Sequence, residues 1–233
     1  NNEKDAAWQV LRGSVAVNAP AQLPDSGLNF HIQTKSFNVD DWRRYLGELA
    51  QKRGVSQSTA VSTTAVGATT GFSQYIEPNS FSLITDELYL FGKKLDQIVL
   101  GASHQSGLWQ ANLDSKQASG FISWNGFGNQ QSTGQVAARL SRLMIPRSAA
   151  SDVGDLLEAK STTKQLPSLD IQVENFELFN KKLGFLALQA SNTLSSLGRE
   201  WNIDKLVLKN DDASLHAKGN WVSRQSDSQT KLE

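Results

Sequence analysis

Apolar and polar residues alternate along most of the chain. Leu28, Phe30 and Ile32 are separated by polar residues, and the segment from Ala213 to Trp221 alternates in the same way. A period of two is typical of a β-strand with one buried face. This pattern predicts strands over residues 8–17, 28–39, 81–85, 88–91, 95–103, 109–113, 118–124, 135–145, 169–173, 186–190, 201–209 and 213–221.

Two inserts interrupt the alternation. Trp42, Tyr45, Leu46 and Leu49 fall at i, i+3, i+4 and i+7, which predicts a helix with one apolar face. Asn38 or Asp40 is suited to cap this helix. A second, shorter helix is expected within the insert 146–167, over residues 152–159. A Ser- and Thr-rich stretch, 54–74, is interpreted as a loop with weakly β-prone patches.

Part of the chain repeats. The stretch Phe176–Leu183 corresponds to Leu88–Leu95 after a shift of 88 positions, and the strand 136–145 resembles 30–39. Because repeats indicate stacked units, we expect several strands and one helix about every 100 residues. The Lys181-Lys182 pair is expected to form a solvated turn, as is Lys93-Lys94. The predicted units are 1–124 and 125–221, followed by a polar tail, 222–233, that ends in what resembles a cloning remnant.

The predicted fold is mainly β with short helices. The strands would form a repeat-built, antiparallel, curved sheet around an elongated open groove. A one-sided apolar sheet must be covered by a second layer or by a ligand. One acyl chain of about 16 carbons would gain on the order of 10 kcal/mol there. Alternation nominates as groove lining Leu83, Ile98, Leu100, Ile122, Ile171, Val173, Leu186, Leu188, Leu215 and Ala217.

Composition excludes several classes of function. The chain of 233 residues has 23 basic and 23 acidic residues, so nucleic acid is not expected as the partner. It has no cysteine, which excludes disulfides, thiol catalysis and Cys-ligated zinc. No apolar run approaches the roughly 20 residues of a membrane span. The chain begins in a loop without a signal peptide and is interpreted as a fragment of a longer protein.

No catalytic motif stands out, so an enzyme is not expected. His31, His104 and His216 lie in different predicted strands, and neither metal nor cofactor is expected. Acidic pairs such as Asp40-Asp41 fall at predicted caps and turns, where Asp is common anyway. The six tryptophans are interpreted as packing residues in the core or at a groove end. The alternative interpretation is a closed β-sandwich that serves as a scaffold or a carbohydrate-binding module.

A resemblance makes the interpretation more specific. The segments 166–190, 201–208 and 213–221, and to a lesser degree 40–43, resemble the YhdP-type members of the AsmA-like family of Gram-negative bacteria. This family is related in architecture to the TamB proteins. The resemblance extends from about residue 27 to residue 221, and its motifs are loose and hydrophobic. The stretch 54–74 has no counterpart in it.

The resemblance implies a role. The parent would be a long periplasmic protein tethered to the inner membrane by an N-terminal helix. Its repeats would stack into a β-groove along which phospholipids pass between the inner and outer membranes, with their acyl chains in the groove. Membrane-embedded partner proteins are candidates at either end. No cofactor or catalysis is implied, and sheet edges left by cutting the chain are expected to favour self-association.

Overall fold

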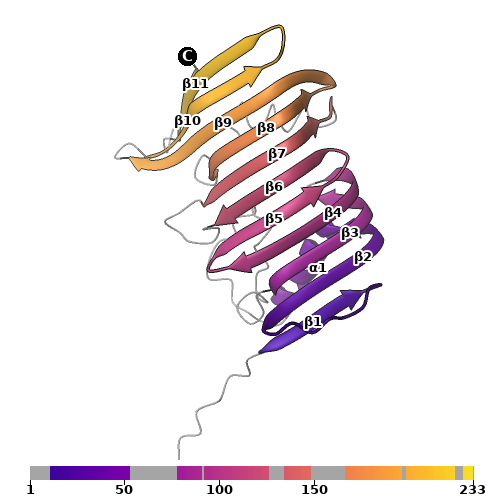
Figure 1. The fold of residues 1–233 in the computed structure, drawn as a ribbon. Helices are drawn as coiled ribbons and strands as arrows, with labels where there is room; N and C mark the ends of the chain where they lie inside the picture. Colours follow the sequence, from indigo (N-terminus) through magenta and orange to yellow (C-terminus); the bar gives the residue numbers. More distant parts are fainter. Residues whose placement is uncertain are drawn as a thin grey trace, which may run out of the picture.

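The structure is a computed structural model that describes residues 11–52, 78–90, 92–125, 134–147, 166–195, 198–223 and 228–232. These residues contain twelve strands and one helix, and the strands lie side by side in chain order (Figure 1). The elements are β1 (Arg12–Val17), β2 (Gly27–Asn38), α1 (Val39–Lys52), β3 (Pro78–Leu90), β4 (Lys93–Gln105), β5 (Leu108–Asp114), β6 (Ala118–Asn125), β7 (Gln135–Ile145), β8 (Ser168–Leu178), β9 (Lys181–Ser195), β10 (Gly198–Lys209), β11 (Ser214–Ser223) and β12 (Ser228–Leu232).

The strands form one curved sheet that does not close, with β1 and β12 as its edges. The expected mainly β, curved and open sheet is confirmed. The described residues form no second sheet, so the alternative of a closed sandwich is wrong. The segment expected from its sequence to be a polar tail, 222–233, contains the strand β12. Ser228–Leu232 pairs with β11 because even a polar segment gains backbone hydrogen bonds at an open edge.

The sheet is not antiparallel throughout, in contrast to the expectation from the sequence. The pairs β1–β2, β2–β3 and β7–β8 are parallel, and the other neighbours are antiparallel. A parallel pair needs a crossover long enough to bring the chain back to its starting end. The inserts between β2 and β3 and between β7 and β8 are long enough for this. These inserts therefore set the direction of the strand that follows each of them.

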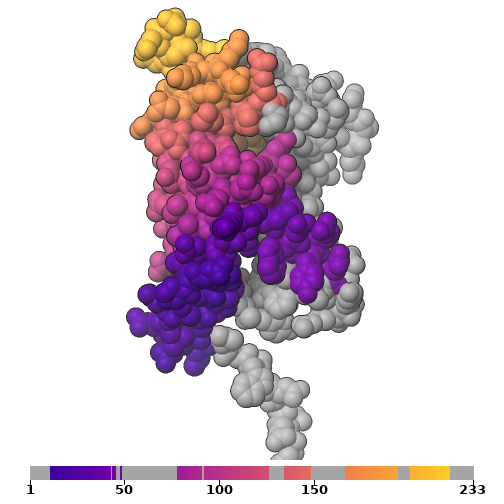
Figure 2. Space-filling view, turned by 90° about the vertical axis from the view of Figure 1, so that its right-hand side faces the viewer, coloured from indigo at the N-terminus to yellow at the C-terminus, as the bar shows by residue number. Residues whose placement is uncertain are grey.

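The helix predicted from the spacing of Trp42 and Tyr45 is present as α1, and both of these side chains are exposed. The backbone N–H of Asp41 donates to Oδ1 of Asn38 (3.1 Å), so Asn38 is the capping residue. The Asp40 carboxylate accepts the N–H of Gly92 (2.8 Å), which ties the start of the helix to the turn between β3 and β4. Phe37 stacks on Trp42 with ring centroids 6.4 Å apart. The helix therefore stands on one side of the sheet (Figure 2).

Other predicted elements are merged, shifted or outside the described residues. Segments 81–85 and 88–91 were expected as separate strands, but residues 81–90 belong to a single strand, β3. The predicted helix 152–159, the loop 54–74 and the start of the first strand at Trp8 lie outside the described residues.

The turn between β8 and β9 lies two residues earlier than expected. Phe179 and Asn180 have φ of 54° and 67°, the left-handed values that a two-residue hairpin turn requires at both positions. Lys181 and Lys182 are therefore the first residues of β9, and Lys93 and Lys94 likewise begin β4. The prediction that these lysine pairs form the turns is wrong.

Strands β2–β4 and β7–β9 each contain a three-residue step in their apolar alternation. In β3, for example, Thr85 and Leu88 are both buried, and Leu88 belongs to the same apolar cluster as Leu83. A strict period of two would place Leu88 on the opposite face, so the backbone must turn at the step. The steps are Thr34–Phe37, Thr85–Leu88, Leu95–Ile98, Leu140–Leu143, Val173–Phe176 and Leu183–Leu186.

Local geometry supports these bends. The Thr34 hydroxyl donates to the Ser36 carbonyl (3.1 Å), and Thr85 makes the equivalent bond to Glu87 (3.0 Å). Gln97 has a φ of 55° and Gly184 one of 78°. Neighbouring strands step at the same level within β2–β4 and within β7–β9, so the bends curve the sheet in each of these two groups.

Candidate functional site

The two faces of the sheet differ sharply in chemistry. Residues paired across strands point to the same side, so the register links Leu83 to Leu100, Leu113 and Gly120 in turn. We call the face that contains Leu83 the inner face. The alternate positions, such as Ser82 and Gln172, form the outer face, which is mostly polar.

All ten residues nominated as groove lining fall on the inner face. The register continues through Ile122, Ile171 and Leu188 as far as Ala217 and Leu215 on β11. The nominated residues are Leu83, Ile98, Leu100, Ile122, Ile171, Val173, Leu186, Leu188, Leu215 and Ala217. Alternation alone thus placed them on one surface, while contact of any of them with lipid stays a prediction.

Burial divides these ten residues into two groups. Ile98 and Val173 have no exposed surface, and Leu83 and Leu186 are nearly as buried. A side chain without exposed surface packs against neighbours and cannot touch a ligand in this conformation. Half-buried or exposed are Leu100, Ile122, Ile171, Leu188, Ala217 and Leu215. These six are the positions at which a ligand could make contact.

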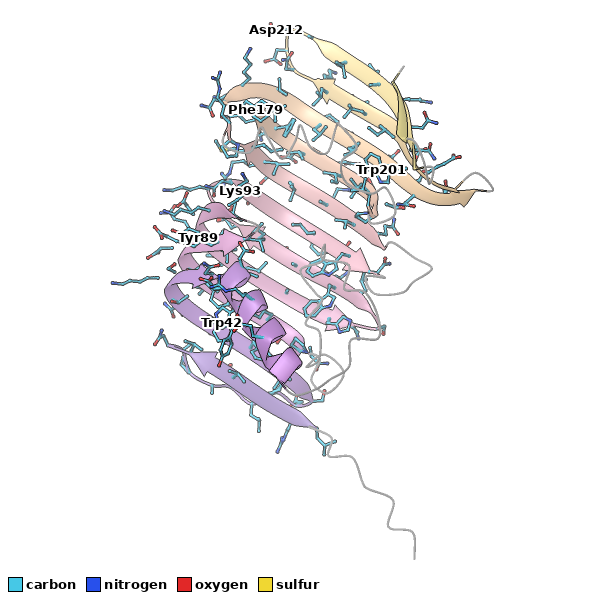
Figure 3. The ribbon with its side chains drawn as sticks, turned by 180° about the vertical axis from the view of Figure 1, so that it is seen from behind. Trp42, Tyr89, Lys93, Phe179, Trp201 and Asp212 are labelled. Carbon is cyan, nitrogen blue, oxygen red and sulfur yellow. The ribbon has the colours of Figure 1, made fainter. Side chains whose placement is uncertain are left out.

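The buried residues form two clusters along the inner face. Leu83, Leu88 and Ile98 centre the first, on β3 and β4, and the second centres on β7 to β9 around Val173 and Leu186. Phe37 packs on the first cluster and Trp42 stacks on Phe37, so α1 lies on the inner side over β2–β4, as the view from behind shows (Figure 3). Trp42 itself remains 52% exposed.

The two sides of the sheet along which the strand ends lie also differ; these sides are distinct from the edge strands β1 and β12. One edge, which we call the turn edge, holds the β3–β4, β5–β6, β8–β9 and β10–β11 turns, with Lys93 and Phe179 among its residues (Figure 3). Trp201 lies at the opposite edge. We call that edge the Trp edge, because Trp109, Trp124 and Trp201 all occupy inner-face positions near the strand ends there.

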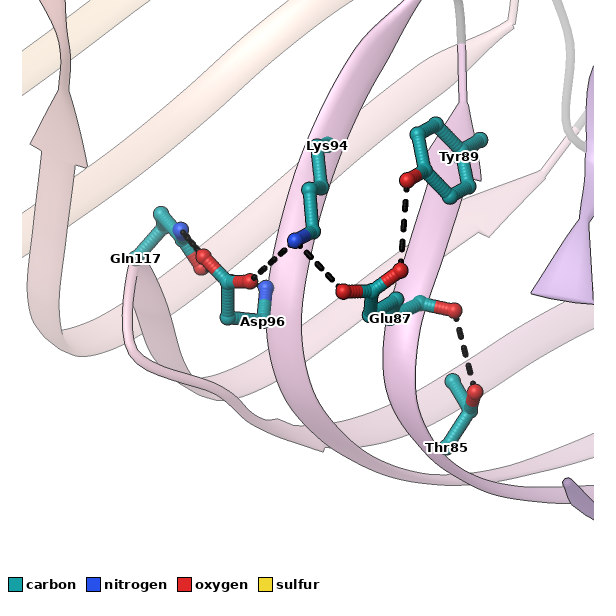
Figure 4. A network of polar contacts seen from close by, with 6 residues as sticks. All are labelled: Thr85, Glu87, Tyr89, Lys94, Asp96 and Gln117. Atoms are coloured by element: carbon teal, nitrogen blue, oxygen red, sulfur yellow. Dashed lines mark hydrogen bonds and ion pairs between the residues drawn. The ribbon is translucent and has the colours of Figure 1, made fainter. Parts of the chain in front are cut away.

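A polar network braces the turn edge (Figure 4). Lys94 Nζ lies 2.6 Å from Glu87 Oε1 and 3.4 Å from Asp96 Oδ1, and the Tyr89 hydroxyl donates to Glu87 (3.2 Å). The Gln117 amide donates to Asp96 (2.9 Å). The bond from Lys94 holds the pKa of Glu87 below its ordinary value, and Glu87 in turn raises the pKa of Lys94. The bond from Gln117 chiefly lowers the pKa of Asp96.

The described residues offer little for other chemistry. His31, His104 and His216 lie on β2, β4 and β11, and no group of three or more His, Asp or Glu side chains among those residues is placed to hold a metal ion. Within the same part of the chain, no helix has the length and apolar character needed to cross a membrane.

The whole chain matches one family model. That model, described as YhdP protein, covers residues 1–233. The chain belongs to the YhdP family. This confirms the resemblance and places the chain among bacterial envelope proteins of the AsmA-like kind. The YhdP family is not known as a family of enzymes. No significant match to this YhdP-family chain was found among curated proteins or among solved structures.

Sequence reasoning missed two features of the site. The first is the three-residue step, although its signal is present in pairs such as Val173–Phe176, where two polar residues separate apolar ones. The second is the arrangement of rings at the Trp edge. The sequence indicates that Trp109 and Trp124 are packing residues, but their direct pairing across β5 and β6 emerges only from the register.

Proposed function

We propose that this chain is a segment of a periplasmic, bridge-like lipid-transfer protein. Its inner face carries the acyl chains of phospholipids between the inner and outer membranes, and the parent protein is anchored in the inner membrane. The observation that carries the proposal is the continuity of the inner face. One register of apolar residues runs from β2 to β11, and no second sheet among the described residues covers it.

The geometry suits a ligand with long apolar chains. Half-buried side chains such as Leu100, Ile171 and Leu188 follow one another across the strands rather than gathering in a closed pocket. Each CH₂ group buried there contributes about 0.8 kcal/mol to the binding free energy. The affinity of an acyl chain therefore rises with the number of its carbons that are buried. Binding of this kind needs no specific contact to a head group, and the ligand remains free to slide along the face.

The direct test is mass analysis of organic extracts from the purified chain. We expect phospholipid to copurify, at amounts that exceed the carry-over in an unrelated protein purified in parallel. A lipid-free extract from protein purified without detergent would contradict the proposal.

A matched pair of variants locates the bound lipid. Leu188 is a half-buried inner-face residue, and its neighbour Gln189 is exposed on the outer face. Leu188→Asp places a carboxylate where acyl chains would lie, so the copurified lipid should fall severalfold, whereas Gln189→Asp should leave it unchanged. A photo-crosslinking residue at position 188 should capture phospholipid in cells, and one at position 189 should not. Equal effects at the two positions would argue against lipid on the inner face.

A further inference from the structure

Three aromatic rings stack on one another at the Trp edge. The ring centroids of His104 and Trp109 lie 4.8 Å apart with an interplanar angle of 18°, and those of Trp109 and Trp124 lie 5.6 Å apart at 3°. The rings come from the ends of β4, β5 and β6, where the register pairs them directly. All three are half-buried on the inner face. They therefore border the apolar surface on one side and solvent on the other.

The two indole N–H groups of this stack point to a use beyond packing. Within the part of the chain that the structure describes, neither Trp109 nor Trp124 has a hydrogen-bond partner, and neither indole nitrogen is among the buried unpaired atoms. Trp201, at the corresponding place on β10, instead donates its indole N–H to the Pro167 carbonyl (2.9 Å). A buried indole N–H normally finds a partner, so the stack keeps two donors at the boundary with solvent.

The chain neighbours of the stack carry no charge. The residues within two positions of His104, Trp109 and Trp124 along the chain are all uncharged. An anionic phosphate would find no cation among these neighbours, and the faces of the middle ring are occupied by stacking, so it cannot receive a cation on its π-face. The donors suit neutral oxygen acceptors attached to an apolar body. The ester carbonyl groups of a glycerolipid, at the junction of acyl chains and head group, have this chemistry.

We propose that the His104–Trp109–Trp124 stack binds the glycerol-ester region of a diacyl glycerolipid. The indole N–H groups of Trp109 and Trp124 donate to ester carbonyl oxygens, the acyl chains run from there across the inner face, and the head group stays beyond the Trp edge in water. This inference rests on the proposed function and adds the recognised chemical group. The site recognises the ester linkage and not the head group, so lipids with different head groups are accepted alike.

The test compares ester with ether lipids on matched variants. Trp109→Phe combined with Trp124→Phe keeps two stacking rings and removes both donors, and Trp42→Phe on α1 is the control. The probes are dioleoyl phosphatidylethanolamine and its diether analogue, which lacks the carbonyl oxygens. Binding to the purified 233-residue chain is measured by native mass spectrometry, with circular dichroism to confirm folding.

We expect the double variant to bind the diester lipid about tenfold more weakly, since two hydrogen bonds are lost. Its affinity for the diether lipid should be unchanged, and the native chain should prefer the diester by a similar factor. An equal affinity of the native chain for both lipids, or an equal loss for both in the double variant, would overturn the inference and leave the proposed function standing. If the native chain bound neither lipid, both proposals would fall.

Quenching of tryptophan fluorescence gives a second measurement. Its main comparison uses the native chain alone, so it does not depend on whether a variant folds. Phosphatidylcholine brominated at carbons near the ester should quench the emission of the native chain more strongly than the same lipid brominated near the methyl ends. The difference should disappear in the double variant. The assignment would be contradicted if lipid brominated near the methyl ends quenched the emission at least as strongly as lipid brominated near the ester. It would also be contradicted if a soluble oligosaccharide, and not lipid, quenched the emission.

Discussion

Two copies of the same edge differ in how they use their aromatic residues. In the first, His104, Trp109 and Trp124 stack on one another. In the second, Asn192 stands in the place of His104, and Trp201 in that of Trp109. The Asn192 amide donates to the Leu166 carbonyl (2.6 Å), and Trp201 donates to Pro167. The second copy thus ties down the chain that enters β8, whereas the first directs its indole donors to the boundary with solvent.

The comparison teaches that residues at equivalent positions of the two repeats can make different contacts. Phe30 pairs with Phe81 in the first copy, and their equivalents Val136 and Leu169 pair in the second. The backbone plan therefore recurs, while the hydrogen bonds at the edge differ with the local acceptors. The proposed unit boundaries at residues 124 and 221 stay predictions.

The largest expected effect comes from the two cluster centres. Ile98 and Leu186 are equivalent in the repeat, and each is buried in its own cluster. Ile98→Ala and Leu186→Ala should each lower the free energy of unfolding by about 2 to 5 kcal/mol, with Ile98 the more costly because it has no exposed surface. Chemical denaturation of both variants measures this. Costs below about 1 kcal/mol at either site would mean that the clusters do not hold the sheet together.

The next effect concerns the bend in β9. Gly184 has a φ of 78°, and a Cβ there would lie 2.4 Å from the Lys209 carbonyl oxygen. Gly184→Ala should therefore cost about 2 to 3 kcal/mol of unfolding free energy. Gly101, on β4, has no neighbouring atom within 4 Å of the place that a Cβ would take, so Gly101→Ala is the matched control and should be close to neutral. Equal melting temperatures for the two variants would contradict the strained bend.

A smaller effect separates the two copies of the Trp edge directly. Trp201→Phe removes the hydrogen bond to Pro167 and should lower stability by about 1 kcal/mol more than Trp109→Phe does. The two substitutions remove the same atoms, and the hydrogen bond to Pro167 is lost only with Trp201. Thermal denaturation in the absence of lipid provides the measurement, and a larger loss for Trp109→Phe would reverse our assignment of roles.

The smallest effect should appear at the turn edge as a function of pH. Glu87 and Asp96 have lowered pKa values, so their stabilising contribution is present above the ordinary carboxyl pKa of about 4 and is lost as the pH falls through the lower folded values. The pKa of Lys94 is raised, so its contribution is lost only at strongly alkaline pH, as the pH rises through the folded value.

The second copy lacks both carboxylates, since Asn175 and Gly184 stand in the places of Glu87 and Asp96. Glu87→Gln should therefore flatten the acid limb of the stability curve slightly. Glu174→Gln, at an exposed position on β8, should not. Melting temperatures between about pH 3 and 7, a range that brackets the carboxyl pKa values, compare the two. An unchanged acid limb in Glu87→Gln would show that the network contributes nothing.

Much of the fold could be predicted from alternation. Strands around Phe30, Ile98 and Leu188 and the inner-face membership of all ten nominated residues follow from a period of two and from the repeat. The parallel pairs could not be predicted, because strand direction depends on where an insert returns the chain. The hairpin turn at Phe179-Asn180 was missed, because Phe is an unusual residue at positive φ and the lysines beside it looked more turn-like.

The site itself was only half predictable. Alternation identifies the inner face, but it cannot separate Ile98, which is fully buried, from Leu100 two residues later, which remains accessible. That difference arises from the bend and the neighbouring strands. The stack of His104 on Trp109 likewise depends on the register between β4 and β5, and no local pattern predicts it.

The three-residue steps have a consequence for the size of any longer assembly of such units. They curve each stepped strand along its own length, for example between Val173 and Phe176. Adding strands at an edge changes only the span, by about 4.8 Å a strand, so five further strands extend it by about 24 Å. Duplication of units can therefore lengthen the sheet without altering the curvature along each strand.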